Sequence, residues 1–224
     1  MKRSYGQFCG VARALDVLGE RWTLLVVREL IVGPQRFKDL LDSLPGIGTN
    51  LLAARLRDLE RDGLIGRRKL PRPAGSTVYE LEPLGRELEP IVLAIGRWGR
   101  KLLEPRAGDQ RFQGRWLLFA LRANFVAARA RRVRETYELR IGGDVVHARV
   151  SDGRLDVAEG AAGEPDLVVE ASLDVLLALA RGDTTPAAEI KAGKLATRGS
   201  RKALERFWSI FDGAGLPPGQ TAVA

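Results

Sequence analysis

A turn, a helical run and a hairpin rich in cations follow one another between residues 45 and 82. The turn is PGIG at 45–48, and the run TNLLAARLRDLERDGLI after it repeats Leu52, Leu56 and Leu59 at helical spacing. The segment RRKLPRPAG then leads into STVYEL, whose valine and tyrosine favour a strand. These residues predict a helix with one buried face and one free face, followed directly by a two-stranded ribbon.

Positive charge is concentrated in the same stretch. Residues 55–72 hold seven Lys or Arg against three acids, a net charge of +4 where the whole chain has +8. On the helix such charge also fits a solvated face, with Arg61 paired to neighbouring acids. A hairpin has no structural need for Arg-Arg-Lys at 67–69, however, and cations there suit phosphate. The helix and the ribbon together indicate a winged helix-turn-helix that binds double-stranded DNA.

The rest of the N-terminal region is predicted to be helical. Helices are expected over residues 8–18, 21–32 and 36–44, and Gly33-Pro34 ends the second of them. At the start of the recognition helix, Thr49 and Asn50 have short polar side chains suited to reading bases, whereas Arg55 has the alternative of pairing within the domain. The expected DNA-binding residues are Arg36, Lys38, Thr49, Asn50, Arg55, Arg57, Arg67, Arg68, Lys69 and Arg72.

A second apolar stripe follows the hairpin. In a helix that starts at Pro83, leucine, isoleucine and tryptophan side chains recur at alternating spacings of four and three residues. A homodimer that shares these helices is the simplest use of the stripe, and the alternative is that the helix packs on its own domain. Pro90 is expected to kink the helix. The expected dimer interface comprises Leu15, Leu88, Ile91, Ile95, Trp98 and Leu102.

The composition argues against several classes of protein. The 224 residues suffice for two domains, and one cysteine and one histidine, His147, leave little basis for a disulfide or a metal site. No phosphate-binding loop, nucleophile elbow or pair of acid/base carboxylates stands out, so neither an enzyme nor a cofactor is expected. No apolar run approaches the roughly 20 residues of a membrane span, and the N-terminus lacks a signal-peptide pattern. These features predict a cytoplasmic protein without a membrane partner.

The C-terminal half combines strands and helices. Residues 103–111 read as a linker and 115–130 as an apolar helix, after which strands are expected over 135–141, 144–150, 154–160 and 166–172. Their period-two alternation and Gly-Asp and Asp-Gly turns predict an antiparallel meander. Two short helices, a further strand over 193–199 and a final helix capped by Ser200 complete an α+β fold. The predicted domains are residues 1–106 and 107–215.

The N-terminal region resembles a known family. ALDVLGERWTLLVVREL, the RF after a Gly-Pro break, RLRDLERDGLI and YELEPLGRELEPIV are similar to the HxlR-type winged helix-turn-helix regulators, over nearly all of residues 5–104. The resemblance implies a dimeric transcriptional regulator, commonly a repressor. Two residues depart from the pattern, since Gly48 stands where the family usually has a serine cap and Glu82 where it usually has threonine. Glycine is an acceptable cap, but the missing hydroxyl removes a potential phosphate contact.

The C-terminal half resembles a second family. PDLVVEAS, LLALARGD, GKLATRG and the closing helix are similar to the sterol-carrier-protein-like domain, over about residues 112–213. Relatives of that fold enclose an apolar tunnel, which implies a lipophilic small-molecule effector as a partner. The alternative is that these side chains form an ordinary core. The candidate lining residues are Trp116, Phe119, Phe125, Leu176, Leu179, Phe207 and Phe211.

Cys9 has two interpretations. A cysteine in the first turn of a helix lies at the positive end of the helix dipole, which lowers its pKa, and some members of the HxlR-type family sense oxidants through a cysteine there. The other interpretation is a small packing residue, because no second cysteine exists to resolve a sulfenic acid. Three functions therefore stay open: a ligand-responsive regulator, a redox regulator acting through Cys9, and a lipid carrier that does not bind DNA.

Overall fold

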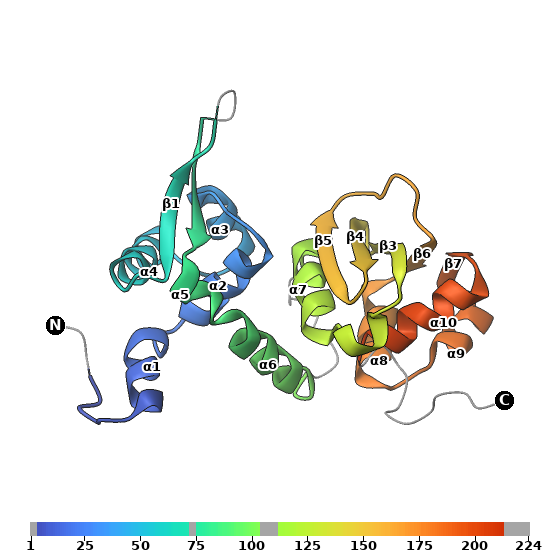
Figure 1. Cartoon of the computed structure of the whole chain (residues 1–224), viewed down its shortest axis with the longest axis horizontal. Helices are drawn as coiled ribbons and strands as arrows, with labels where there is room; N and C mark the ends of the chain where they lie inside the picture. The colour runs from blue at the N-terminus through green and yellow to red at the C-terminus, as the bar shows by residue number, and fades with distance from the viewer. Residues whose placement is uncertain (1–3, 72–74, 104–111, 213–224) are drawn as a thin grey trace. The chain divides into compact units, whose positions relative to one another are not determined.

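The computed structural model describes residues 4–71, 75–103 and 112–212, and Figure 1 labels its helices and strands. The chain divides into two compact units, residues 1–92 and 93–224. The domain boundary expected after residue 106 lies outside the described residues and stays a prediction. Within the described ranges, no helix has both the length and the apolar character that a membrane crossing needs.

The first unit is a small helical core with a two-stranded ribbon. Its elements are α1 (Gly10–Leu18), α2 (Thr23–Val32), α3 (Phe37–Ser43), α4 (Thr49–Arg61), β1 (Ile65–Lys69), β2 (Thr77–Leu81) and α5 (Pro83–Arg86), with α6 (Glu89–Arg100) leading into the second unit. The leucine stripe predicted for α4 is buried at Leu52, Leu56 and Leu59. The expected helix, turn, helix and hairpin are therefore confirmed in their order and in the face that they bury.

Helix α2 begins two residues later than predicted. Trp22 has φ of +78°, in the left-handed region that bulky residues rarely adopt, so it cannot belong to a right-handed helix. The conformation places the Trp22 ring beside Gly46 of the PGIG turn, where a Cβ would lie 3.7 Å from the ring. The turn before the recognition helix thus packs against this tryptophan.

The helix predicted from Pro83 onward is two helices. Instead of one helix kinked at Pro90, α5 ends at Arg86, a turn follows at Glu87 and Leu88, and α6 begins at Glu89. Pro90 has no N–H, and in a continuous helix its ring would collide with the carbonyl of residue 86. In the first turn of a new helix neither problem arises. The interruption expected at Pro90 is confirmed, but one helix ends and a second begins, where a bend within one helix had been expected.

The second unit is an α+β domain with one five-stranded sheet, as predicted. After α7 (Gly114–Asn124) and the 3-10 turn η1 (Ala127–Ala130) come β3 (Arg134–Ile141), β4 (Asp144–Ser151), β5 (Arg154–Glu159), β6 (Leu167–Ala171), α8 (Leu173–Arg181), α9 (Pro186–Lys191), β7 (Leu195–Gly199) and α10 (Arg201–Ile210). The strand order is β5-β4-β3-β6-β7. Ser200 caps α10 as expected, accepting a hydrogen bond from the Ala203 N–H at 3.0 Å.

The antiparallel meander predicted for this sheet is correct for β3, β4 and β5 and wrong for β6. Strand β6 pairs with β3 in parallel. The loop after β5 crosses over β4 and β3 before β6 begins. Two contacts hold it there: the Ala162 N–H donates to the Glu138 carboxylate of β3 at 2.8 Å, and His147 Nδ1 of β4 lies 3.0 Å from the Gly160 carbonyl oxygen. The chain therefore enters β6 on the far side of β3 and runs in the same direction.

One face of this sheet forms the core. Tyr137 and Leu139 on β3, Val146 and Ala148 on β4 and Leu167 on β6 are all buried, and their register places them on the same face. Tyr137 meets the Phe207 ring of α10 at a centroid distance of 5.2 Å, so α10 covers this face. Alternate residues, such as Arg140 and Glu170, point to the opposite face.

Candidate nucleic-acid interface

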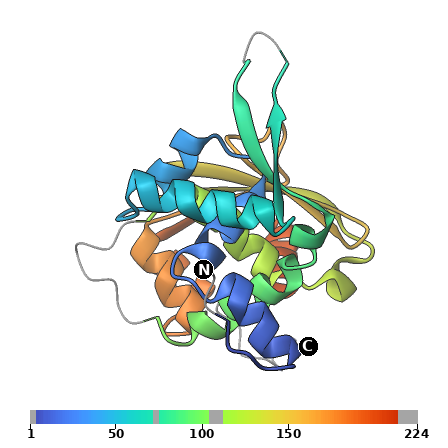
Figure 2. The same cartoon turned by 90° about the vertical axis from the view of Figure 1, so that its left-hand side faces the viewer.

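Helix α4 presents a polar surface opposite its buried leucines. Thr49, Asn50 and Arg57 are exposed, and Gly48 precedes the helix in an extended conformation without a side-chain cap. Figure 2 shows α4 in cyan along the side of the unit that faces the viewer, with the β1–β2 hairpin projecting beyond it. The first turn of α4, where Thr49 and Asn50 lie, is therefore free to approach a groove.

Arg55 is used differently from the other predicted contacts. Its side chain is only 16% exposed, and its guanidinium lies 3.3 Å from the Asp58 carboxylate and 3.7 Å from that of Glu20. Since Glu20 precedes α2, the arginine connects the recognition helix to the turn between α1 and α2. These contacts favour the interpretation in which Arg55 pairs within the domain.

Helix α3 adds two exposed cations. Arg36 and Lys38 both lie at its N-terminal end, and the Asp39 carboxylate accepts a hydrogen bond from the Arg36 backbone N–H at 3.1 Å. The segment before α3 is tied to the ribbon, because Gln35 and Tyr79 exchange two backbone hydrogen bonds of 3.0 and 2.7 Å. These backbone hydrogen bonds therefore fix the start of α3 against strand β2 of the hairpin.

The cations on β1 are partly engaged by acids of the same unit. Arg68 donates from Nε and Nη2 to the two oxygens of Glu80 at 2.8 and 3.0 Å, and this bidentate pair holds the pKa of Glu80 below its usual range. Arg67 donates to Glu60 of α4 at 2.9 Å and lies over the Tyr79 ring at 5.4 Å. Lys69 is exposed, and Arg72 lies outside the described residues. The sequence did not indicate that Glu60 and Glu80 take part.

The apolar stripe of α6 is exposed along one side. Ile91, Ile95, Trp98 and Leu102 have 45–64% of their surface accessible in the single chain, while Leu88 is partly buried. Leu15 on α1 is also exposed, together with Phe8 and Val11, which were not predicted from the sequence. Their spacing of three and four residues is the signal that could have found them.

The opposite side of α6 is packed within the second unit. Arg97 donates to the Ala123 carbonyl at 2.9 Å, and Arg100 donates to Asn124 Oδ1 at 3.0 Å. Gly96 makes this approach to α7 feasible, because a Cβ there would lie 2.8 Å from the Phe119 ring. One side of α6 thus carries an exposed apolar stripe and the other contacts α7, whereas the alternative had expected packing on the N-terminal domain.

Cys9 is exposed at the start of α1. It occupies the N-cap position in an extended conformation, and it is a free thiol. The backbone N–H groups of Ala12 and then Val11, at the open end of the helix, lower the pKa of the Cys9 thiol. The interpretation as a buried packing residue is wrong, because the first turn of α1 is open to solvent around it.

The candidate ligand-binding residues mostly pack in the second unit. Phe207 and Phe211 lie 5.0 Å apart between ring centroids, the Phe125 ring meets Phe211 at a tilt with 5.7 Å between centroids, and Leu179 is buried. Trp116 contacts Phe112 edge to face at 6.2 Å. Leu179, Phe207 and Phe211 thus belong to a closed core, whereas the other four candidates are partly exposed: Trp116, Phe119, Phe125 and Leu176. An effector tunnel among these residues stays a prediction.

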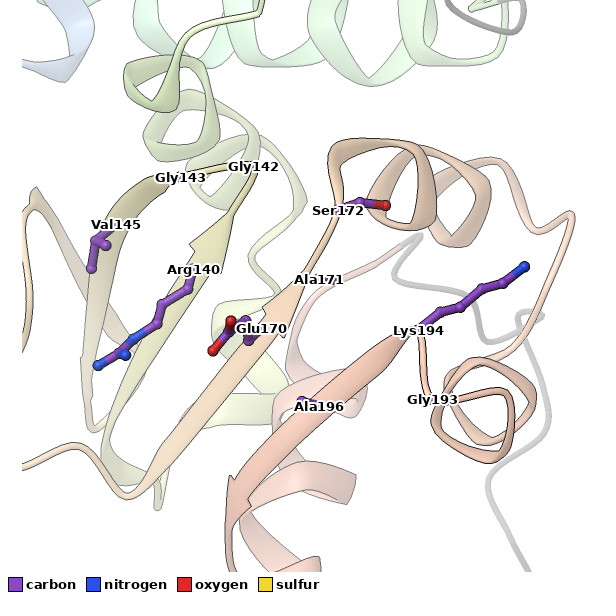
Figure 3. Close-up of a pocket in the computed structure, with 10 residues that line it drawn as sticks. All are labelled: Arg140, Gly142, Gly143, Val145, Glu170, Ala171, Ser172, Gly193, Lys194 and Ala196. Atoms are coloured by element: carbon purple, nitrogen blue, oxygen red, sulfur yellow. The ribbon is translucent and has the colours of Figure 1, made fainter.

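A hollow of about 530 Å³ lies on the opposite face of the sheet (Figure 3). Arg140 and Glu170, which are register partners on β3 and β6, line it together with Lys194 and the Gly142-Gly143 turn. The lining combines charged side chains with small apolar ones such as Val145 and Ala196, and it includes none of the predicted pocket residues. Among the described residues, no group of three or more His, Cys, Asp or Glu side chains is placed to hold a metal ion.

Comparisons with known proteins match these two units to two families. Residues 17–107 match the HxlR-like helix-turn-helix family, and residues 117–212 match the SCP-2 sterol transfer family. An uncharacterised HTH-type transcriptional regulator of Synechocystis is 39% identical over 99 residues, which are 44% of this chain and 73% of that protein. The HTH-type transcriptional regulator YodB of Bacillus subtilis is 33% identical over 92 residues, 41% of this chain and 82% of that protein.

Among solved structures, the reduced form of YodB from B. subtilis is 30% identical, covers 45% of this chain and all of that chain, and has a TM-score of 0.38. The two family matches confirm both resemblances noted in the sequence. A buried leucine stripe, an exposed recognition face and a cationic ribbon are the parts that a helix-turn-helix protein uses on DNA. The chain belongs to the HxlR-like helix-turn-helix transcriptional regulators and carries a C-terminal domain of the SCP-2 sterol transfer family.

Proposed function

We propose that this regulator binds operator DNA as a homodimer and represses transcription from the bound site. The observation that supports this proposal best is the first turn of α4. There Thr49 and Asn50 are exposed to solvent, while the leucines of the same helix are buried. A recognition helix enters the major groove with its N-terminal residues on base edges, and asparagine can form a paired contact with adenine. In this proposal Arg36, Lys38, Arg57 and Lys69 meet phosphates.

The homodimer is supported by the apolar surface of α1 and α6. Leu15, Ile91, Ile95 and Trp98 are exposed in the single chain, and exposed apolar stripes of this kind commonly mark an interface. Two copies related by a two-fold axis would present two recognition helices to a roughly palindromic site. Residues 1–106 form the DNA-binding and dimerisation domain in this proposal, and residues 107–215 form a ligand-binding domain.

The experiment is selection and sequencing of DNA fragments bound by the purified protein, followed by affinity measurements at several salt concentrations. We expect an enriched sequence with two related half-sites. Replacing Arg67, Arg68 and Lys69 by alanine should reduce the slope of log affinity against log salt by about one unit for each phosphate that is no longer bound. Recovery of unselected fragments, with affinity independent of salt, would favour the lipid carrier instead.

The C-terminal domain is proposed to bind a lipophilic effector that changes DNA affinity. Its match to the SCP-2 sterol transfer family supports this role. An effector can shift DNA binding only if it has different affinity for two arrangements of the dimer. Titration of the full chain with a fluorescent long-chain fatty acid, followed by a new measurement of operator affinity, tests the idea; binding without any change in DNA affinity would contradict regulation.

A second candidate function is oxidant sensing through Cys9. It is favoured by one observation, the exposed thiol at the open end of α1 whose pKa the helix N–H groups lower. A low pKa raises the thiolate fraction, and the thiolate is the reactive form. Treatment with hydrogen peroxide should then reduce operator binding by the wild type and leave the Cys9→Ser variant unaffected. Equal loss in both proteins would exclude Cys9 as the sensor.

A further inference from the structure

Two of the three cations on β1 are paired with carboxylates before any DNA is present. Arg68 makes the bidentate pair with Glu80, and Arg67 pairs with Glu60 of α4 while lying over Tyr79. The side chain of Arg68 is 47% exposed and that of Glu80 25%, so the pair is open to solvent and within reach of a binding partner. The sequence shows only the cations of the hairpin, whereas in the fold two of them are already paired with acids.

A guanidinium has two edges that can form paired parallel hydrogen bonds, and each edge can bind either a carboxylate or a phosphate. While Glu80 occupies the Nε and Nη2 positions of Arg68, a phosphate cannot take them. The carboxylate also repels the phosphate directly. Binding of a phosphate on the Nε–Nη2 edge of Arg68 thus requires that the Glu80 pair opens.

The two ion pairs differ in the number of groups that hold the arginine and in the elements that they connect. Arg68 and Glu80 are diagonal neighbours on one face of the ribbon, since Arg68 lies opposite Val78 and Glu80 lies opposite Gly66. Their contact is confined to the ribbon and can open without moving another element. Arg67 is held by Glu60 on α4 and by the Tyr79 ring at once, which fastens β1 to the recognition helix.

We propose that Glu80 competes with DNA phosphate for Arg68 and so lowers the affinity of the protein for DNA of any sequence. This inference rests on the proposed DNA-binding function. Since a phosphate contact is independent of sequence, the competition lowers operator affinity and non-specific affinity by a similar factor, and the base contacts from α4 still decide between sequences. Glu80 thereby sets the overall strength of DNA binding without contacting a base.

The test uses the full chain with Glu80→Gln, which keeps the size and the hydrogen-bonding oxygen but removes the charge. Affinity is measured for a random-sequence duplex and for the selected operator over a range of salt. We expect the variant to bind random DNA about two- to fivefold more tightly at low salt, the range of an exposed ion pair. The gain should shrink as salt screens the pair, and the operator should gain by a similar factor because the contact is independent of sequence.

Glu82→Gln is the matched control. Glu82 is exposed two residues further along the same chain segment, and it has no ion-pair partner among the residues that the structure describes. The substitution Glu82→Gln removes the same negative charge as Glu80→Gln at a position two residues away. If the effect comes from releasing Arg68, Glu82→Gln changes random-DNA affinity far less than Glu80→Gln does. Equal gains in the two variants would mean a general charge effect and would overturn the inference.

A double-mutant cycle with Arg68→Ala isolates the pair. In that background Glu80→Gln should no longer raise the affinity for random DNA, because no arginine is left to release. Weaker binding by Glu80→Gln than by the wild type would show that Glu80 orients Arg68 toward DNA, which is the opposite of the inference. If the wild type itself lacks salt-dependent DNA binding, the proposed function fails as well, so the two failures are distinguishable.

Discussion

Phe8 and Phe207 are both phenylalanines that adjoin or lie in amphipathic helices, yet Phe8 is fully exposed beside α1 and Phe207 is 3% exposed in α10. Phe207 contacts the rings of Tyr137, Trp208 and Phe211 within one core. Around Phe8, the apolar side chains of Val11 and Leu15 are also open to solvent. The same residue types are therefore used within one chain for a closed core in one region and for an open surface in the other.

This contrast indicates where partners should bind. The core around α10 already satisfies its apolar groups inside the second unit, so it adds to stability. The stripes on α1 and α6 keep apolar area in water, which is unfavourable unless another surface covers it. The paired arginines differ in exposure: Arg67 and Arg68 keep 48% and 47% of their side chains accessible on the ribbon. Arg206, by contrast, is 27% accessible and lies against Glu135 at 2.6 Å.

The largest expected effect is on the closed core. Phe207→Ala should lower the unfolding free energy of the C-terminal unit by about 3–5 kcal/mol, because it leaves a cavity next to three aromatic rings. Urea denaturation followed by circular dichroism measures it. Phe8→Ala is the matched control and should leave that transition within about 0.5 kcal/mol. Similar losses in both variants would remove the distinction between the two regions.

The next effect concerns the exposed stripe of α6. Ile95→Asp would place an unpaired carboxylate in the proposed dimer interface, at a cost on the order of 3 kcal/mol, or more than a hundredfold in the dimer dissociation constant. Sedimentation equilibrium gives that constant. Ile190→Asp introduces the same charge at another exposed isoleucine, on α9, and should not change it. A dimer unaffected by Ile95→Asp would mean that the stripe packs elsewhere.

A smaller effect distinguishes base reading from phosphate binding. Asn50→Ala should weaken operator binding by about 1–3 kcal/mol while hardly changing binding to random DNA. Lys69→Ala, by contrast, should weaken both to a similar extent, because a phosphate contact is independent of sequence. Fluorescence anisotropy on both duplexes decides between them. Equal weakening by Asn50→Ala on both duplexes would assign Asn50 to the backbone and leave base reading to Arg57.

The smallest effect is on the reactivity of Cys9. Its pKa is lowered by the helix N–H groups, so the thiolate fraction at neutral pH exceeds that of an ordinary cysteine. The rate of alkylation by iodoacetamide should therefore reach half its maximum at a lower pH than for free cysteine, as mass spectrometry can follow. Val11→Pro removes one of the two donors and should move the midpoint part of the way back. A midpoint equal to that of free cysteine would contradict the prediction.

Much of the recognition surface could be predicted because its signals are local. Leucines at spacings of four and three define the buried face of α4, and this in turn leaves Thr49, Asn50 and Arg57 outside. Ser200 could be recognised as a cap for the same reason, since the bonded N–H lies three residues away. Phe8 and Val11 carried such a signal too, but the short N-terminal segment offered few repeats to establish a period.

Other features depend on residues that are distant along the chain. Arg55 could not be assigned from its neighbours alone, because Glu20 contacts it from the turn between α1 and α2. The partner of Arg68 lies twelve residues away across the ribbon, and that of Arg67 lies seven residues back in α4. The sequence shows the charges, but only the fold shows which of them are already paired.

The amino-acid sequence alone was enough to establish the order of the elements, the buried face of α4, the α+β character of the second unit and the family. These follow from periodicity and from motifs, in which each residue is interpreted with its near neighbours. The parallel pairing of β6 with β3, the break before α6, the left-handed Trp22 and the acids that engage the ribbon emerged only in the folded chain. Pairing direction, steric fit and ion-pair geometry are set by groups that meet in space after long stretches of intervening chain.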